Sequence, residues 1–508
     1  MAVRKIAHPS VDDRKAKGLE ARDRAELSSH TKWKAAADRP DPVALLEEQD
    51  ATREPDLVPV RHGRMMVSPF TFYRGAARIM AADLAGTPVA GLETQLCGDA
   101  HLSNFGAFAS PERVLLFDVN DFDETLPGPF EYDVKRMAAS FEIAARNNGF
   151  SKADAQAATL ASVRAYREAM ASFAQMGTMD IWYAHLDEDE LRAGIRTVVT
   201  GAAKQEKGAK KQEKADKQAK VPKKAEKRAA KQEKADREKE KAAKTAGKRA
   251  EKILTKAHTR DSLQALSKLG EQVDGKYRIV SQPPIVVPAR DLAATYGLSP
   301  DQVVPAIHDQ FRAYRATLQD DRRHLLENFT FVDTARQVVG VGSVGMRVHL
   351  LLLDGPGGED PLFLQVKQAG PSVYEAHLGP SRYDNHGARV VNGKRLIQSA
   401  TDILVGWTSF DDMDFYVRQF RDMKGAITVD GMDGSSLLDY ARVCGTLLAK
   451  GHARSTGATR LSAYLGKGDS ADRAFARFAR AYADQTEADH EALGKAVTSG
   501  RLPAEPGI

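Results

Sequence analysis

The sequence has few of the features that mark secreted, disulfide-stabilised or membrane proteins. Cys97 and Cys444 are its two cysteines, too few and too far apart for a disulfide framework or a cysteine-based zinc site. The N-terminal stretch MAVRKIAHPSVDDRKAKG lacks the apolar core of about 7 to 15 residues that a signal peptide needs. No stretch reaches the roughly 20 apolar residues of a membrane span. We therefore expect a cytoplasmic protein that makes no membrane contact.

Positive charge is concentrated in one segment of the chain. Residues 204–252 hold 20 Lys and Arg against 9 Asp and Glu, whereas the other residues hold 54 basic and 60 acidic ones. The segment repeats KQEK and has almost no apolar residue to bury, so we predict a partly helical, solvated Lys-rich insertion over 201–258. A spacer role and weak electrostatic contact of 204–252 with a polyanion such as nucleic acid are both compatible with this composition.

Hydrophobic periodicity divides the remaining chain into parts. The chain of 508 residues has 42% apolar residues, which predicts a globular body of several domains. Helical spacing is strongest over 70–84, 132–147, 151–175, 300–328, 387–406, 435–454 and 471–492. Strand-like runs lie at 92–97, 113–119, 329–343, 346–354, 361–369 and 414–420. Strands and helices are thus segregated along the chain, which predicts an α+β protein.

These patterns suggest five regions. We expect a loosely held polar N-terminal arm, a helical lobe with the first two strands, the Lys-rich insertion, a sheet-rich nucleotide-binding lobe, and C-terminal helices that pack on the helical lobe. The corresponding boundaries are 1–55, 56–200, 201–258, 259–430 and 431–508.

Several chemically active side chains lie in or beside the first two strand-like runs. The segments CGDAHLSNFGAF and VLLFDVNDFDE contain Asp99, His101, Asn104, Asp118, Asp121 and Asp123. Neighbouring carboxylates repel one another and raise one another's pKa, so such a cluster indicates a bound cation or a role in proton transfer. Carboxylate and amide oxygens suit Mg²⁺ or Mn²⁺. Turn formation and helix capping are the alternative explanation.

The spacing within this cluster is more specific than its composition. A carboxylate that accepts a proton from a hydroxyl, an amide oxygen five residues later, and a second carboxylate after another strand are the arrangement of phosphoryl-transfer enzymes. Asp99, Asn104 and Asp121 fit these three positions, with Asp118 as a rival to Asp121 for the metal. We therefore expect ATP and Mg²⁺ or Mn²⁺ as cofactors.

A glycine-rich segment lies about 240 residues later in VVGVGSVGMRVHLLLLD. Gly340, Gly342, Ser343 and Gly345 stand between two strand-like runs. A dinucleotide-binding loop would be followed by a helix, whereas a strand on both sides is typical of the phosphate-covering loop of kinases. A tight turn without a ligand is the alternative.

Lys367 lies in the next strand-like run, LFLQVKQA, and matches the kinase lysine that holds the α and β phosphates. A buried lysine needs a counter-charge. Glu375 is the nearest candidate, and Gln398 or Asp402 on the following helix are the others. The alternative is a solvent-facing lysine on an edge strand.

The motifs resemble those of two related groups. GDAHLSN resembles the G-D-x-H-x-x-N catalytic loop of the aminoglycoside and choline kinase branch of the protein-kinase-like superfamily, and NDFDE resembles its I-D-F-[DE] pattern. This resemblance implies that Asp99 is the base and that Asn104 and Asp121 bind magnesium. The wider set, RMMVSPFTFYRG, GDAHLSNFG, FDVNDFDETLPGPFEYDVKR, VGVGSVGMR, LQVKQA and YVRQFRDMKG, closely resembles the bacterial DUF2252 family over about residues 55–495.

The DUF2252 resemblance implies a two-lobed kinase-like fold. In kinases the glycine loop and the lysine precede the catalytic loop, whereas here they follow it, so the fold should be circularly permuted. The catalytic candidates are Asp99, His101 and Lys367. The metal candidates are Asn104, Asp121 and Asp118. The nucleotide-binding candidates are Gly340, Gly342, Ser343, Gly345, Lys367 and Glu375.

Three classes of function are compatible with these residues. The leading one is an ATP- and Mg²⁺-dependent phosphotransferase that acts on a small hydroxylated molecule or a protein. The second is a metal-dependent phosphoesterase in which Asp99 and His101 bind metal. The third is a non-catalytic pseudokinase or polyanion-binding scaffold. Basic residues in the family-like motifs could touch phosphate or pair with an acid: Arg64, Arg74, Arg136, Arg418 and Lys424.

Overall fold

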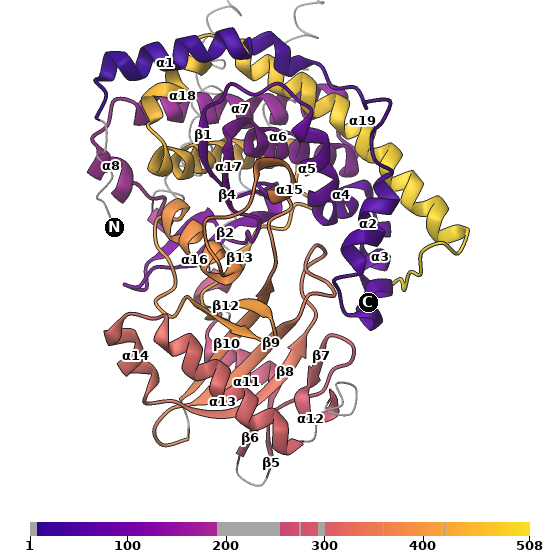
Figure 1. Ribbon diagram of the computed structural model, residues 1–508, viewed down its shortest axis with the longest axis vertical. Coiled ribbons are helices and arrows are strands. Elements are labelled where there is room, and N and C mark those ends of the chain that lie inside the picture. Colours follow the sequence, from indigo (N-terminus) through magenta and orange to yellow (C-terminus); the bar gives the residue numbers. More distant parts are fainter. Residues whose placement is uncertain are drawn as a thin grey trace, which may run out of the picture.

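The computed structural model describes residues 8–189, 255–273, 276–292, 300–358, 360–420 and 422–507, without the side chains of 300–307. Helices and antiparallel sheets form a mixed α+β structure, which confirms the predicted class. Figure 1 shows most helices gathered in one part of the molecule and the largest sheet in the other. The Lys-rich segment 204–252 lies outside the described residues.

The helical part is built around α6 (Phe130–Asn147), which is buried along almost its whole length. Its neighbours pack their apolar faces against it because an amphipathic helix is stable only when that face is covered. The other helices of this part are α3 (Val58–Met66), α4 (Pro69–Gly75), α5 (Ala77–Ala85), α7 (Lys152–Phe173), α8 (Thr178–Tyr183), α17 (Gly434–Ser455), α18 (Ala458–Leu465) and α19 (Ser470–Thr498).

The N-terminal segment differs from the loosely held arm that its polarity predicts. It forms α1 (Val11–Arg24) and α2 (Pro42–Asp50), and α1 lies along α18, as Figure 1 shows. Arg39 bridges Asp83 on α5 and Asp489 on α19, with distances of 2.7 Å to each carboxylate. Ion pairs and a few small buried residues thus fix a segment that has little hydrophobic periodicity to reveal its packing.

Two small sheets lie at the edge of the helical part. β1 (Glu93–Leu96) pairs with β4 (Leu126–Pro129), and β2 (Phe105–Ala109) pairs with β3 (Leu115–Val119) and with β13 (Gly425–Ala426). The strands expected at 92–97 and 113–119 are β1 and β3. The sequence did not reveal β2, because FGAFA lacks the alternation and β-branched residues of a typical strand.

The large sheet is antiparallel, with the strand order β11-β12-β10-β9-β8-β7. Its strands are β7 (Val286–Pro288), β8 (Thr330–Gln337), β9 (Val348–Asp354), β10 (Pro361–Ala369), β11 (Gly406–Phe410) and β12 (Met413–Gln419). Leu351 and Leu353 of β9 share a core with α13 (Pro300–Ala316) and α14 (Asp320–Leu326). Leu350 and Leu352 share a core with α11 (Ser262–Leu269) on the other face, because successive side chains of a strand alternate.

The remaining short elements lie beside this sheet or between it and the helical part, and among them α15 contacts α5 and α16 contacts both β12 and α17. They are β5 (Gly270–Val273), β6 (Lys276–Ile279), α12 (Ala289–Leu292), α15 (Glu375–Leu378) and α16 (His386–Ile397). None of the helices in the described ranges combines the length and the apolar character that crossing a bilayer requires.

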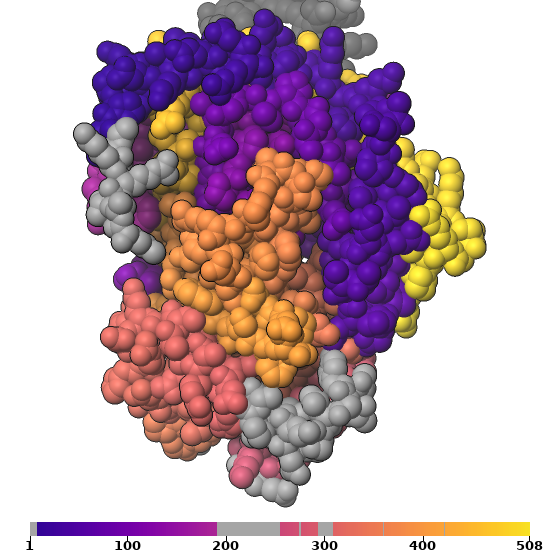
Figure 2. All heavy atoms as spheres, viewed as in Figure 1, coloured from indigo at the N-terminus to yellow at the C-terminus, as the bar shows by residue number. Residues whose placement is uncertain are grey.

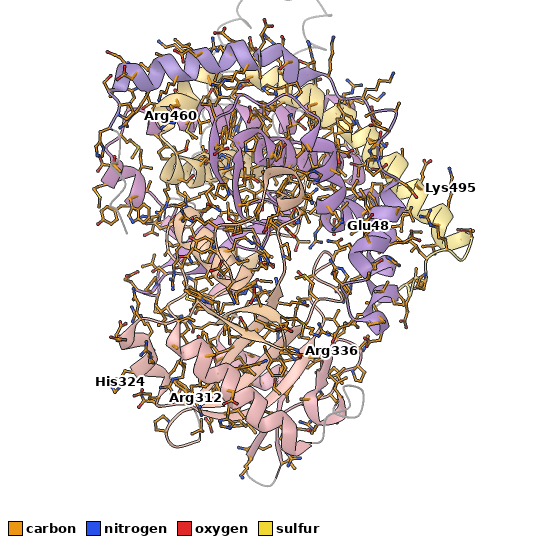
Figure 3. All side chains as sticks on the ribbon, viewed as in Figure 1. Glu48, Arg312, His324, Arg336, Arg460 and Lys495 are labelled. Carbon is orange, nitrogen blue, oxygen red and sulfur yellow. The ribbon has the colours of Figure 1, made fainter. Side chains whose placement is uncertain are left out.

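Ion pairs link the large sheet to the helical part. Arg336 of β8, labelled in Figure 3, lies 2.7 Å from Asp56 and 3.4 Å from Glu54, which precede α3. Because Arg336 and Glu54 are both buried, these contacts fix the position of the sheet relative to the N-terminal helices.

Candidate active site

A cavity of about 790 Å³ lies where the helical part meets the large sheet. In the space-filling view of Figure 2, the indigo N-terminal helices and the orange segment around α15 and α16 meet over this region. Most residues selected from the sequence line this cavity: Asp99, His101, Asn104, Asp121, Gly340, Gly342, Ser343, Lys367 and Glu375. Two of the candidates, Asp118 and Gly345, are not part of the lining. Segments about 240 residues apart therefore converge on one site.

Asp99 is held in place by three neighbours. Its Oδ1 accepts a hydrogen bond of 2.8 Å from Nε of the buried Arg136, and its Oδ2 lies 3.6 Å from Nε2 of His101. The Asn104 side-chain amide donates to the Asp99 carbonyl oxygen over 2.7 Å. The turn before Asp99 requires glycine, because Gly98 has φ +79° and a β-carbon there would lie 2.4 Å from the carbonyl oxygen of Glu124. The carboxylate thus faces the cavity in a fixed orientation.

His101 is buried beside Asp99. Burial lowers the pKa of His101 to about 4, with help from the charges of Arg74 and Arg136 and against the opposing effect of Asp99. Its Nδ1 has no hydrogen-bond partner among the described residues. His101 is therefore a neutral imidazole at neutral pH.

Lys367 on β10 is bonded to the acidic segment that follows β3. Its ammonium lies 2.7 Å from Asp123 Oδ2 and 3.8 Å from Asp121 Oδ1. Burial alone would lower the pKa of Lys367, but Asp121 and Asp123 more than offset it and hold that pKa above its ordinary value. Asp123 also accepts a hydrogen bond of 2.6 Å from the Tyr416 hydroxyl. Lys367 is therefore a charged group whose partners lie in the same cavity.

Asp121 is the most exposed member of this cluster: it lines the cavity, and 51% of its side-chain surface is accessible to solvent. Arg418 of β12 lies 3.2 Å from it. Although removal from bulk water would raise the pKa of Asp121, the charges of Lys367 and Arg418 hold that pKa well below its ordinary range. Asp121 is thus an ionised carboxylate that can accept a cation from the cavity.

The counter-charge of Lys367 differs from the three residues that the sequence suggested. Glu375 accepts hydrogen bonds from the backbone of Ser372 and Ser381. Gln398 donates to the carbonyl oxygen of Val119. Asp402 accepts two hydrogen bonds from Gln419. Asp123 takes this role instead, and its place in the acidic segment was the one signal that could have indicated it.

α16, the second helix after Lys367, brings cations to the acidic segment instead of an acid. Arg389 of α16 donates to the carbonyl oxygens of Asp123 and Thr125. Lys394 lies one turn further along α16, 4.3 Å from the centre of the Phe122 ring and 3.9 Å from Asp123. Burial lowers the pKa of Lys394 to about 8. These two residues, which the sequence did not single out, hold the acidic segment in place, Arg389 from within the cavity lining and Lys394 from outside it.

Asp118 does not join the cavity. It is fully buried in β3, where it pairs with the Lys450 ammonium and accepts a hydrogen bond of 2.8 Å from the Ser399 hydroxyl. Lys450 comes from α17, far along the chain, so the sequence held no local sign of this pair. Asp118 therefore stabilises the packing of β3 on α17, and Asp121 is the carboxylate that a ligand can reach.

The glycine loop between β8 and β9 is tied to the N-terminal helices. Arg64 donates to the Gly340 carbonyl oxygen over 2.6 Å, and the Glu54 backbone N–H donates to the Gly345 carbonyl oxygen over 2.8 Å. Gly340 and Gly345 have φ values of +64° and +83°, which other residues rarely adopt. The strand, loop and strand order expected from the sequence is present, and the loop forms one wall of the cavity.

The other basic residues from the motifs have different surroundings. Arg136 and Arg418 pair with the site carboxylates, as described above, and Arg74 lines the cavity. Burial holds the pKa of Lys424 well below its ordinary value.

Asn104 and Asp121 are the residues of the cavity that could hold a magnesium ion, and they would be its two protein ligands. Within the described ranges, no group of three or more His, Cys, Asp or Glu side chains is arranged to hold a metal ion. Asn104 and Asp121 both line the cavity, and the Asp121 backbone N–H donates to the Asn104 carbonyl oxygen over 3.3 Å. Mg²⁺ is commonly bound by one or two protein oxygens together with substrate phosphates and water. One carboxylate and one amide oxygen match that mode.

The chain matches a known family over residues 53–246 and 223–496. The family is described as "Uncharacterized protein conserved in bacteria (DUF2252)". Because the match extends over most of the chain, the protein belongs to the DUF2252 family, which confirms the resemblance found in its motifs. Comparisons with curated proteins and with solved structures gave no match.

Proposed function

We propose that this protein is an ATP- and Mg²⁺-dependent phosphotransferase that acts on a small hydroxylated molecule or a protein. One observation carries the proposal: the helical part supplies Asp99, Asn104 and Asp121 to the same cavity that receives the glycine loop and Lys367 from the large sheet. Phosphoryl transfer depends on positioning and on electrostatic stabilisation, and it needs a base, metal ligands and phosphate-binding groups within one site.

The order of elements in the large sheet supports a kinase-like arrangement. The glycine loop lies between β8 and β9, Lys367 lies on β10, and the helix α16 follows. Kinases have these parts in the same order, although their catalytic loop comes later in the chain. The proposed fold is therefore a permuted version, which is physically acceptable because contacts, and not the position of the termini, determine a fold.

Asp99 has the position of the base in this proposal. The acceptor hydroxyl oxygen forms a bond to the γ-phosphorus, the bond between that phosphorus and the β–γ bridging oxygen breaks, and its electron pair leaves with ADP. The hydroxyl proton passes to Asp99, which Arg136 holds in one orientation. The neutral His101 beside Asp99 adds no charge that would repel or attract the proton.

The polar residues on the other side of the cavity hold the triphosphate. Asp121 and Asn104 would hold Mg²⁺, which neutralises phosphate charge when bound. Lys367 would contact phosphate oxygens while remaining close to Asp123. Backbone N–H groups of the glycine loop can approach phosphate because Gly340 and Gly342 carry no side chain.

Isothermal titration calorimetry on the full chain with Mg·ATP tests the proposal. We expect measurable binding by the natural protein and a loss of about a hundredfold in affinity for Lys367→Met, because one phosphate-binding charge is removed. Lys268→Met, at an exposed position on α11, is the matched control and should bind normally. Circular dichroism verifies that each variant is folded. Absence of Mg·ATP binding by the natural protein would refute the proposal.

The phosphoesterase alternative has less support from the geometry. It requires Asp99 and His101 as metal ligands, but Asp99 already bonds to Arg136, and the charges of Arg74 and Arg136 add to burial in lowering the pKa of His101. A cationic environment disfavours a divalent metal at these atoms. The scaffold alternative depends on residues 204–252, which lie outside the described residues.

A further inference from the structure

Arg74, at the C-terminal end of α4, is a cation in the candidate site to which no partner has been assigned. It lines the cavity together with Asp99, His101 and Asp121. Its guanidinium forms no hydrogen bond or ion pair with any side chain or carbonyl oxygen of the described residues, and its buried Nε lacks a partner. The other arginines around the site each have a bonding partner for their guanidinium. Arg136 bonds to Asp99, and Arg418 pairs with Asp121. Arg53, Arg78 and Arg389 also have an unpaired Nε, but their terminal nitrogens bond to Val344, Glu48 and Thr125. A poorly hydrated, unpaired guanidinium is unfavourable unless an anion binds to it.

The backbone of Arg74 is fixed between the two halves of the site. On one side, Arg136 donates to the Tyr73 carbonyl oxygen over 2.9 Å and to Asp99 over 2.8 Å, so that it joins the end of α4 to the candidate base. On the other side, a β-carbon on Gly342 would lie 3.2 Å from the Arg74 carbonyl oxygen. The backbone of Arg74 is therefore located between Asp99 and the glycine loop.

The electrostatic surroundings agree with this position. Burial lowers the pKa of Arg74, while the carboxylates of Asp99, Asp430 and Asp121 oppose that shift. Asp99 and Asp121 are the proposed base and metal ligand, and both are already bonded to other cations. The phosphoryl group in transit must pass between a base and a metal ligand. An anion bound to the Arg74 guanidinium would thus lie between Asp99 and Asp121.

We propose that the Arg74 guanidinium binds the γ-phosphoryl group of the nucleotide and neutralises its charge during transfer. This inference rests on the proposed phosphotransferase function and adds a catalytic residue to it. An arginine supplied by the same chain stabilises the transferred group in some other phosphoryl-transfer enzymes, because its planar fork can bond to two phosphate oxygens. Binding of an anionic group of the acceptor by Arg74 is the competing explanation.

Calorimetry with two nucleotides on the full chain tests this assignment. The relevant quantity is the ratio of the Kd for Mg·ADP to the Kd for Mg·ATP, which reports contacts to the γ-phosphate. We expect Arg74→Met to reduce this ratio by about tenfold and to leave the Mg·ADP affinity within about twofold, because a charge-assisted contact to one phosphate is lost. Arg442→Met is the matched control, since Arg442 is an exposed residue of α17 that pairs with Asp439.

A thermal melt without nucleotide separates this role from a structural one. Because the Arg74 guanidinium bonds to nothing in the described chain, Arg74→Met should keep or raise the melting temperature, and Arg74→Lys should restore part of the ATP preference. The assignment is overturned if both nucleotides lose affinity equally, if the ratio does not change, or if the variant melts at a lower temperature. Failure of the natural protein to bind either nucleotide would instead refute the phosphotransferase function on which the assignment rests.

Discussion

Asp118 and Asp121 lie three positions apart and have contrasting surroundings. Asp118 is fully buried against Lys450, whereas about half of the Asp121 side-chain surface, 51%, is exposed in the cavity. A buried ion pair that loses one partner leaves an uncompensated charge, and a partly exposed one leaves a charge that water can solvate. The two aspartates should therefore respond differently to the same substitution.

We predict that Asp118→Asn destabilises the protein by about 3–5 kcal/mol, because the buried Lys450 ammonium loses its counter-charge. Its affinity for Mg·ATP should not change. Asp121→Asn should have the opposite effect, with little change in melting temperature and a loss of about a hundredfold in Mg·ATP affinity. Thermal melts and calorimetry on both variants measure the difference. The reverse pattern would make Asp118 the ligand-binding carboxylate.

The low pKa of His101 predicts that the stability of the protein depends on pH. The folded-state pKa of His101, about 4, is below the value of about 6.5 for an unfolded chain, so unfolding takes up a proton between these two pH values. Stability from the neutral imidazole is fully present above pH 6.5 and is lost as the pH falls towards 4. The loss should reach about 3 kcal/mol.

Melting curves of the natural protein and His101→Gln between pH 7 and pH 4 measure this effect. The melting temperature of the variant should fall by less over that pH range than that of the natural protein, because the variant has no imidazole to protonate. His324→Gln is the control, since His324 lies at the surface on α14, as its label in Figure 3 shows. Equal slopes for the natural protein and His101→Gln would show that His101 is not protonated on unfolding in this range.

Among the elements, α1 shows how small residues can determine packing. Gly18 of α1 faces α18, and a β-carbon there would lie 2.2 Å from the Arg460 carbonyl oxygen. The neighbouring Leu19 is 52% exposed. Close approach of the two helices therefore depends on the absence of a side chain at position 18.

We predict that Gly18→Val lowers stability by about 1–3 kcal/mol, because the added side chain forces α1 away from α18. Valine favours a helix more than glycine does, so a loss of stability would report on packing and not on helix propensity. Leu19→Ala changes an exposed residue of the same helix and should have little effect. Thermal melts compare the two variants. An unchanged melting temperature for Gly18→Val would show that α1 is not docked there.

The sequence predicted elements with strong periodicity and missed those defined by distant contacts. The long amphipathic helices α7 and α17 were predicted to within two residues at each end, whereas α19 continues to Thr498, beyond its predicted end at 492. The helix expected at 70–84 is two helices that meet at Ala76. The order of strands around the glycine loop was also predictable, since β8, β9 and β10 are rich in apolar and β-branched residues. β2 and β11 were missed because FGAFA and GWTSF have no clear alternation.

The same distinction applies to the candidate site. Local motifs identified Asp99, His101, Asn104, Asp121 and Lys367, all of which line the cavity. The pairs Lys367 with Asp123 and Asp118 with Lys450 join residues 244 and 332 positions apart. Such pairs depend on the tertiary fold, and one sequence without that fold cannot identify them.

On the scale of the whole molecule, the described lining of the candidate site and the Lys-rich segment 204–252 come from different parts of the sequence. Among the described residues, those that line the cavity come from positions 40–124 or 340–414. A protein that lacks 204–252 should therefore bind Mg·ATP with an affinity within about twofold of that of the full chain. Calorimetry on both proteins checks this prediction, with circular dichroism as the control for folding. A loss of binding with retained folding would show that the segment contributes to nucleotide binding.

The separation of the two halves of the cavity along the chain has a consequence during synthesis on the ribosome. Asp99, Asp121 and Asp123 emerge from the exit tunnel well before Lys367 and Arg418, the cations that pair with Asp121. Until those cations arrive, the nascent polypeptide carries adjacent carboxylates that repel one another. The candidate site can consequently form only after residue 418 has been translated, so a prematurely terminated product would lack it.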